Sequence, residues 1–173
     1  GSSAVMTRKA NEKNVIWPAE LELIVFDFDG VMTDNSVYLT ADGTEMVRCN
    51  RSDGWGIDQL HVMGFPMFVL STEANPVLRA RCEKLKLPVM HGLAHKEDTL
   101  SEIIAERNIR AENVAYVGND ENDLACLKLV GLPVVVADAH PSVLKTAKLV
   151  LKKDGGNGAV REFCDMVRDR YDQ

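Results

Sequence analysis

Short apolar runs alternate with amphipathic helical segments along most of the chain, and this alternation restricts the possible folds more than any other feature. The runs are rich in Val, Ile, Leu and Phe, which is typical of strands buried on both faces of a sheet. Strands are predicted over residues 21–26, 66–70, 87–90, 114–117, 133–136 and 148–151. Helices are predicted over residues 76–86, 96–107, 122–130 and 159–171, and one more starts at Pro141. This order predicts an α/β fold, a Rossmann-like three-layer sandwich with a mostly parallel sheet.

A projecting β-hairpin is predicted directly after the first strand. Residues 36–40 and 44–48 favour extended structure and flank a glycine-containing turn, Ala41-Asp42-Gly43. Ahead of the first strand, residues 1–18 are polar and lack periodicity. We expect them to be a flexible N-terminal segment with a tag remnant at its start, followed by one domain over residues 19–173.

The composition excludes several classes of function. The 173 residues carry a formal net charge of −6 and no run of Lys or Arg, which argues against binding to nucleic acid or to an anionic membrane. The longest apolar stretch, residues 63–70, is far shorter than the ~20 residues that span a bilayer. The four cysteines are widely spaced, which indicates reduced thiols in a cytoplasmic protein.

Several polar residues directly follow a predicted strand or open the next helix. They are Asp27, Asp29, Ser71, Thr72, Lys96 and the segment 119–123. Any one of them alone is common in a surface turn, a helix cap or a solvated helix. Ligands bind outside the carboxyl ends of the strands in such sheets, so their joint occurrence in this order favours one functional site.

The paired carboxylates indicate chemistry on a phosphate. Asp27 and Asp29 leave an extended strand on the same side because they are two residues apart. Together with an oxygen-rich loop they are typical of a Mg²⁺ site. The cation lets a carboxylate approach a phosphate dianion, while a hydroxyl group and a lysine supply donors to the phosphate oxygens.

Four motifs resemble the haloacid dehalogenase superfamily of aspartyl-phosphate hydrolases, and the resemblance covers residues 21–165. The motifs are FDFDGVMTD at residues 26–34, RSDGWGI at 51–57, VADAHP at 136–141 and GGNGAVRE at 155–162. More narrowly, they are similar to the capless branch that acts on 3-deoxy-2-keto sugar acid phosphates. This branch includes the 3-deoxy-D-manno-octulosonate 8-phosphate phosphatases and the phosphatase-like domains of acylneuraminate cytidylyltransferases.

The resemblance implies a phosphomonoesterase acting on a small sugar acid phosphate through an aspartyl-phosphate. Asp27 would be the nucleophile, and Asp29 would act first as general acid and then as general base. Ser71 would hold a phosphoryl oxygen, and Lys96 would pair with Asp27 and the transferring group.

The resemblance also implies a Mg²⁺ cofactor held by the Asp27 side chain, the Asp29 backbone carbonyl and Asn119. The family usually has an acid in place of Asn119, so we expect weaker metal binding, with Asp120 and Asp123 compensating through hydrogen bonds. An alternative is a non-catalytic oligomerisation or regulatory domain associated with an acylneuraminate cytidylyltransferase.

Substrate contacts are expected from a separate set of side chains. These are Thr33, Thr72, Glu73, Arg81, Lys84 and Arg161. Glu73, Arg81 and Lys84 resemble the type that acts on nine-carbon ketodeoxynononate or neuraminate 9-phosphate, whereas octulosonate 8-phosphate phosphatases usually carry Gly-Arg after the serine. These three residues fall near one helix face and could reach a substrate carboxylate, but a solvated charged surface explains them equally well.

The spacing leaves no room for a cap domain. Only 44 residues separate Asp27 from Ser71, and 25 separate Ser71 from Lys96. The resemblance implies that a neighbouring subunit of a homotetramer covers the site, with the hairpin at residues 36–48 as the association element. A plain edge hairpin is the alternative.

Overall fold

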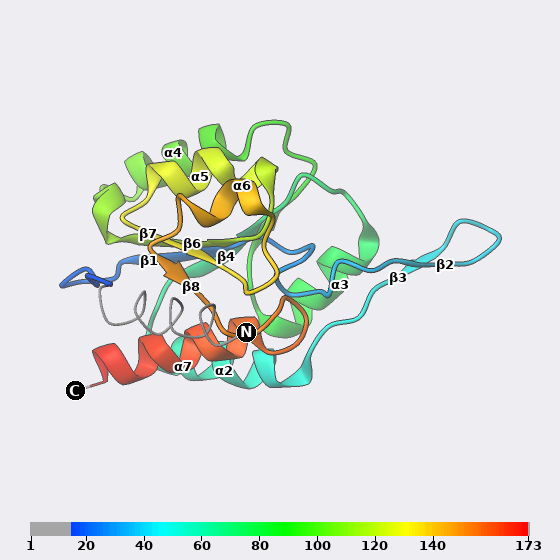
Figure 1. Cartoon of the computed structure of the whole chain (residues 1–173), viewed down its shortest axis with the longest axis horizontal. Coiled ribbons are helices and arrows are strands. Elements are labelled where there is room, and N and C mark those ends of the chain that lie inside the picture. The colour runs from blue at the N-terminus through cyan, green and yellow to red at the C-terminus, as the bar shows by residue number, and fades with distance from the viewer. Residues whose placement is uncertain (1–14, 173) are drawn as a thin grey trace.

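The computed structural model describes residues 15–172, which form a six-stranded sheet with parallel neighbours throughout (Figure 1). Its strands are β1 (Leu23–Phe26), β4 (Met67–Leu70), β5 (Val89–Met90), β6 (Val114–Gly118), β7 (Leu132–Val135) and β8 (Leu149–Val150). Their spatial order is β5-β4-β1-β6-β7-β8. This is the order of a doubly wound Rossmann-like sheet, which confirms the predicted fold class.

Helices cover both faces of the sheet. They are α2 (Arg51–Val62), α3 (Pro76–Leu85), α4 (Lys96–Glu106), α5 (Leu124–Leu129), α6 (Pro141–Leu144) and α7 (Ala159–Tyr171), with 3₁₀ turns at η1 (Ala111–Asn113) and η2 (Glu121–Asp123). Figure 1 shows α4, α5 and α6 on one face and α2 and α7 on the other. None of the helices within residues 15–172 has the length and apolar character needed to cross a membrane.

The helix α7 begins without a side-chain cap of its own. Its N-cap residue is Gly158, and the N–H of Arg161 in its first turn donates to Asp53 Oδ1 at 2.9 Å. Asp53 is buried on α2, so one helix supplies the N-terminal cap of another. This hydrogen bond ties α2 and α7 together on the same face of the sheet.

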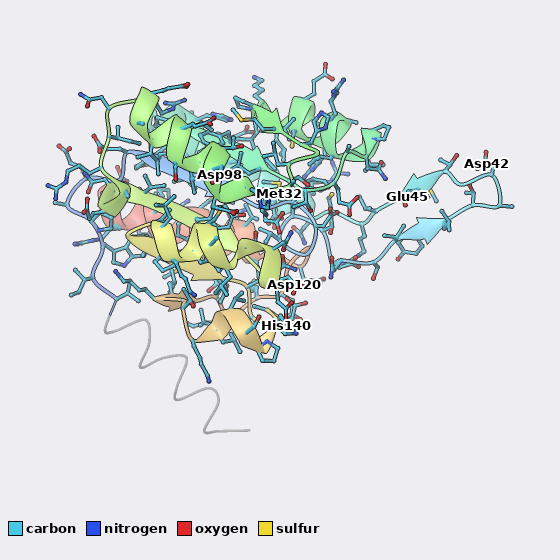
Figure 2. The ribbon with its side chains drawn as sticks, turned by 90° about the horizontal axis from the view of Figure 1, so that it is seen from above. Met32, Asp42, Glu45, Asp98, Asp120 and His140 are labelled. Carbon is cyan, nitrogen blue, oxygen red and sulfur yellow. The ribbon has the colours of Figure 1, made fainter. Side chains whose placement is uncertain are left out.

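The predicted hairpin is present but short. It consists of β2 (Tyr38–Leu39) and β3 (Glu45–Met46), which pair antiparallel and project away from the domain (Figures 1 and 2). The side chain of Glu45 accepts a hydrogen bond from Asn75, the N-cap of α3. No inserted domain occurs in the described part of the chain, which has only this hairpin and α2 between β1 and β4.

The end of the segment ahead of β1 contacts the helix α7. Trp17 stacks on Phe163 of α7 with ring centroids 6.2 Å apart, and the Tyr171 hydroxyl donates to the Pro18 carbonyl oxygen at 2.6 Å. These contacts pack Trp17 and Pro18, at the apolar end of the segment, against the domain. Residues 1–14, including the tag remnant, lie outside the described residues.

Candidate active site

The loops that follow β1 and β6 lie side by side at the centre of the sheet. β1 and β6 are hydrogen-bonded neighbours, and the pairing continues into the loop because the Asp27 N–H donates to the Val117 carbonyl oxygen at 2.9 Å. The chain order of the strands reverses at this point, which is where doubly wound sheets bind their ligands. The fold thus brings Asp27 and Asn119 to one place.

A buried lysine joins the carboxylates of the two loops. Lys96 opens α4, and its Nζ lies 2.5 Å from Asp123 Oδ1 and 3.3 Å from Asp27 Oδ1. The Tyr116 hydroxyl donates to the same Asp123 oxygen at 2.5 Å. Asp123 Oδ2 accepts the backbone N–H of Asn119 at 2.8 Å, so Asp123 also fixes the loop after β6.

Burial and charge set the protonation of these groups. Burial raises the pKa of Asp27 well above its usual value, Asp123 raises it further, and Lys96 opposes both. Burial alone would raise the pKa of Asp123, but the charge and hydrogen bond of Lys96 bring it below its usual value. Burial lowers the pKa of Lys96, yet Asp27 and Asp123 outweigh it and leave that pKa raised. Lys96 and Asp123 therefore form a charged pair, whereas Asp27 lacks enough compensating charge.

The Asn119 amide lies within the acidic centre. One end of the amide faces three acceptors, and an amide nitrogen at this end would donate to Asp27 Oδ2 at 3.0 Å, the Asp29 carbonyl oxygen at 3.1 Å and Asp123 Oδ2 at 3.2 Å. With the amide oxygen at this end instead, carboxylate, carbonyl and amide oxygens would converge, and such a set fits a hard cation such as Mg²⁺. No group of three or more His, Cys, Asp or Glu residues within residues 15–172 is placed to hold a metal, so the fit depends on the carbonyl and the amide.

The loop after Asp27 is shaped by Thr33 and Gly30. The Thr33 hydroxyl oxygen accepts the N–H groups of Gly30 at 3.0 Å and Asn35 at 3.1 Å. Thr33 is 1% exposed and lines none of the cavities at the site. It therefore holds the loop in shape, and its contact with substrate stays a prediction.

A turn near the C-terminus supports this loop from behind. A Cβ atom on Gly155 would lie 1.8 Å from the Gly30 carbonyl oxygen, so only glycine permits the approach. The Gly155 N–H donates to Asp138 Oδ1 at 3.1 Å, and the Gly156 N–H donates to the Val31 carbonyl oxygen at 3.1 Å. These contacts give the VADAHP and GGNGAVRE motifs a structural role at the site.

An open cavity of about 310 Å³ lies over Asp27. Its lining consists of Asp27, Asp29, Asn35, Thr72, Glu73, Asn119, Asp120 and Asn122. Asp120 and His140 lie at this edge of the domain in Figure 2, and the His140 N–H donates to the Asn119 carbonyl oxygen at 2.7 Å. Ser71 is buried at the end of β4 and does not line the cavity; its Oγ accepts the Glu73 N–H at 3.1 Å.

Asp29 faces an acidic part of the site. It is half-buried, and it lines both this cavity and a neighbouring one of about 190 Å³ that reaches the base of the hairpin. Burial raises the pKa of Asp29, and the charges of Glu73 and Glu45 raise it further. This environment favours a protonated Asp29, as a general acid requires.

Two comparisons of the sequence with known proteins identify the family of this chain. The sequence model of the haloacid dehalogenase-like hydrolases matches residues 78–163. The chain is 35% identical over 156 residues to the 3-deoxy-D-manno-octulosonate 8-phosphate phosphatase of Escherichia coli K12, and the match covers 89% of this chain and 83% of the relative. The chain belongs to the haloacid dehalogenase-like hydrolases.

Solved structures resemble this hydrolase over most of its length. A putative hydrolase of this family from Streptomyces avermitilis has a TM-score of 0.84 and 46% identity, with 87% of each chain covered. A 3-deoxy-D-manno-octulosonate 8-phosphate phosphatase from Moraxella catarrhalis, solved with magnesium, phosphate and the sugar acid, has a TM-score of 0.83 and 25% identity, with 86% of each chain covered.

Three residues expected to contact substrate lie away from the Asp27 cavity of the hydrolase. Arg81 donates to the Asn50 carbonyl oxygen at 3.1 Å, and together with Lys84 it lines a separate cavity of about 420 Å³ between α2 and α3. Arg161 pairs with Asp165 at 2.9 Å on α7. Within one chain, the structure therefore groups Thr72 and Glu73 with Asp27 and Asp29 but not Arg81, Lys84 or Arg161.

Sequence reasoning missed Tyr116 and Asp53. Tyr116 is fully buried in β6, and its hydroxyl group binds the carboxylate that holds Lys96. A tyrosine inside an aliphatic strand is a usable signal, because a buried hydroxyl group needs a partner. Asp53 belongs to the RSDGWGI motif, but nothing local in the sequence indicates that its partner is the N–H of Arg161 on α7.

Proposed function

We propose that this chain is a Mg²⁺-dependent phosphomonoesterase that hydrolyses a 3-deoxy-2-keto sugar acid phosphate through an aspartyl-phosphate on Asp27. The observation that carries the proposal is the Asp27–Lys96–Asp123 chain beneath an open cavity, with Asp29 on the cavity wall. The names of the E. coli and M. catarrhalis relatives support the substrate class.

In the first step, an Asp27 oxygen forms a bond to phosphorus while the bond from phosphorus to the sugar oxygen breaks. Asp29 gives its proton to that leaving oxygen, and its raised pKa suits this role. Thr72 lines the cavity for the phosphate oxygens. The Ser71 oxygen accepts the Glu73 N–H, so its own proton is free for a phosphoryl oxygen.

In the second step, water attacks phosphorus and the bond to Asp27 breaks, which releases inorganic phosphate. Asp29, now ionised, takes the proton of the water and returns to its starting state. Lys96 stays charged throughout because Asp123 holds it, so its position beside Asp27 is fixed before substrate arrives.

The oxygens of Asp27, Asp29 and Asn119 would hold the cation. When bound, Mg²⁺ would supply positive charge that offsets the repulsion of Asp27 and a phosphate dianion. Asn119 contributes no charge, so the site carries one negative charge fewer than with an acid at this position. The intact Asp27, Asp29 and Lys96 argue against the alternative of a non-catalytic domain.

The relatives' names favour octulosonate 8-phosphate as the substrate, whereas Glu73 in the Asp27 cavity favours a nine-carbon 9-phosphate. Phosphate release should be measured with octulosonate 8-phosphate, ketodeoxynononate 9-phosphate and neuraminate 9-phosphate, each with Mg²⁺ and with chelator. Turnover of one of them that requires Mg²⁺ supports the proposal. No turnover of any would refute it and favour the regulatory domain.

A homotetramer that completes the site is part of this proposal. The two cavities around Asp29 are lined by acids, and no Arg or Lys of the described chain lines either of them. Arg81 and Lys84 line their own cavity, so they could meet a substrate carboxylate only in a neighbouring subunit's site. The exposed apolar hairpin is a suitable contact between subunits.

A further inference from the structure

The Asn119 amide can satisfy the acidic centre in two orientations. With the oxygen inward, oxygens converge and a cation is needed among them. Turned by 180° about its last side-chain bond, the amide places its nitrogen 3.0 Å from Asp27 Oδ2, 3.1 Å from the Asp29 carbonyl oxygen and 3.2 Å from Asp123 Oδ2. The two N–H groups can then donate to acceptors that otherwise repel one another. A carboxylate at position 119 has no such second orientation.

The residues around Asn119 allow its side-chain amide to rotate by 180° but hold the rest of the residue in place. Asn119 is 9% exposed, its N–H is bound by Asp123 and its carbonyl oxygen by the His140 N–H. On the outer side, a Cβ atom on Gly30 would lie 1.9 Å from the amide, so the amide fits only because that residue is glycine. The side chain is therefore held in place, and turning the amide exchanges its two ends without moving the residue.

We propose that Asn119 closes the metal-free centre with its amide nitrogen and turns its oxygen inward when a divalent cation binds. The rotation on cation binding rests on the proposed Mg²⁺ dependence, whereas closure of the metal-free centre by the amide nitrogen does not. Asn119 thereby sets the cation affinity, because binding must replace hydrogen bonds that already stabilise the metal-free protein.

The variant Asn119→Asp tests both halves, because it exchanges the amide for a third carboxylate beside Asp27 and Asp123. Among residues 15–172, Lys96 is the one cation that pairs with these carboxylates, so the metal-free variant should unfold at a lower temperature than the wild type. Its Mg²⁺ affinity should rise by about tenfold or more, and Mg²⁺ should raise its unfolding temperature by more than it does for the wild type. Asn108→Asp is the matched control, since Asn108 is exposed just after α4, does not line the Asp27 cavity, and the charge change is identical.

Thermal unfolding in chelator and in a Mg²⁺ series, together with calorimetric titration of MgCl₂, gives these quantities. The control should change neither the metal-free unfolding temperature nor the Mg²⁺ affinity by as much as Asn119→Asp does. Equal metal-free stability and equal Mg²⁺ affinity in Asn119→Asp and wild type would overturn the proposal.

The wild-type amide can also be followed directly, which avoids reliance on a variant that fails to fold. In protein with ¹⁵N-labelled asparagine, the Asn119 side-chain protons should exchange slowly without metal, and faster once Mg²⁺ is added. The exposed Asn108 amide is the internal reference, and exchange as fast as that reference in chelator would refute amide closure. A wild type that binds no Mg²⁺ would overturn both the turn and the proposed function, whereas normal Mg²⁺ binding without turnover would count against the proposed function alone.

Discussion

Lys96 and Asp123 form an ion pair of 2.5 Å in which neither side chain is exposed to solvent. The same ammonium lies 3.3 Å from Asp27, so one cation compensates two buried carboxylates. A buried charge without a partner is strongly unfavourable, and this makes Lys96 necessary for the stability of the protein as well as for its proposed chemistry.

Replacing Lys96 by Met should lower the free energy of unfolding by about 3–5 kcal/mol, because both carboxylates lose their cation. Urea unfolding monitored by circular dichroism measures this value. Lys128→Met, an exposed site on α5, is the control and should stay within about 0.5 kcal/mol of wild type. Adding Asp123→Asn to the Lys96 variant should restore part of the loss; no loss in the single variant would contradict the ion-pair argument.

Asp27→Asn should lower phosphate release by about 10³-fold or more while the fold is retained. Its metal-free stability should equal or exceed that of the wild type, because burial and Asp123 disfavour an ionised carboxylate there. Phosphate release with Mg²⁺ and unfolding in chelator are the two measurements. Wild-type turnover in this variant would rule out Asp27 as the nucleophile.

Asp53 should make stability depend on pH. Burial raises its pKa to about 6, against the opposing contact from the Arg161 N–H, so the folded protein binds its proton more tightly than the unfolded chain does. The contribution of Asp53 to the free energy of unfolding is present at low pH and is lost as the pH rises through about 6. The total loss is about 3 kcal/mol. Asp53→Asn should therefore gain stability relative to wild type between about pH 4 and pH 8, measured by urea unfolding, whereas Asp58→Asn on the exposed face of α2 should not. An equal difference at both pH values would show that Asp53 does not titrate in this way.

Gly156→Ala should be more harmful than Gly64→Ala, although both glycines have positive φ angles of +72° and +85°. A Cβ atom on Gly64 meets nothing within 4 Å, so that variant isolates the backbone strain of about 1–2 kcal/mol. A Cβ atom on Gly156 would lie 2.2 Å from the Asp34 backbone nitrogen and displace the loop that carries Asp29. The Gly156 variant should have the lower unfolding temperature and the slower phosphate release of the two. Similar values for both variants would mean that the turn at Gly156 does not position the loop that carries Asp29.

Leu39→Asp should weaken the proposed assembly. Leu39 is 69% exposed at the hairpin, beside the exposed Val37, Tyr38 and Met46. Light scattering after size exclusion should show a smaller species, and phosphate release should fall with it because the neighbouring subunit no longer completes the site. Val62→Asp replaces an 86% exposed residue of α2 and should leave the oligomer unchanged. Identical masses for the wild type and the Leu39 variant would exclude the hairpin as the contact.

Much of the fold follows from local patterns in the sequence. The helix α7 matches its predicted range, and α4 ends one residue earlier than expected, because both have a clear apolar periodicity. The helix expected over residues 122–130 instead divides into η2 and α5. There, Asp120 and Asp123 cap the 3₁₀ turn with their side chains, and these hydrogen bonds are not visible in hydrophobic spacing.

The positions of site residues can be predicted from the sequence where they follow the ends of strands. They cannot be predicted where they depend on how helices pack. The strand-end rule brings Asp27, Lys96 and Asn119 together correctly. Arg81 and Lys84 share a helix with the expected spacing, but the packing of α3 against α2 directs them to another cavity. No local pattern contains that information.

The sheet order also determines when the site can exist during synthesis. Among the strands of residues 15–172, β1 comes first in the chain but lies between β4 and β6, so its hydrogen bonds on one side wait for the chain to reach residue 114. Asp27 meets Lys96 and Asp123 only after most of the domain has emerged. An unfinished chain therefore exposes an unpaired apolar strand ahead of an uncompensated carboxylate. This makes β1 a segment that nascent-chain binding factors should protect until the sheet closes around it.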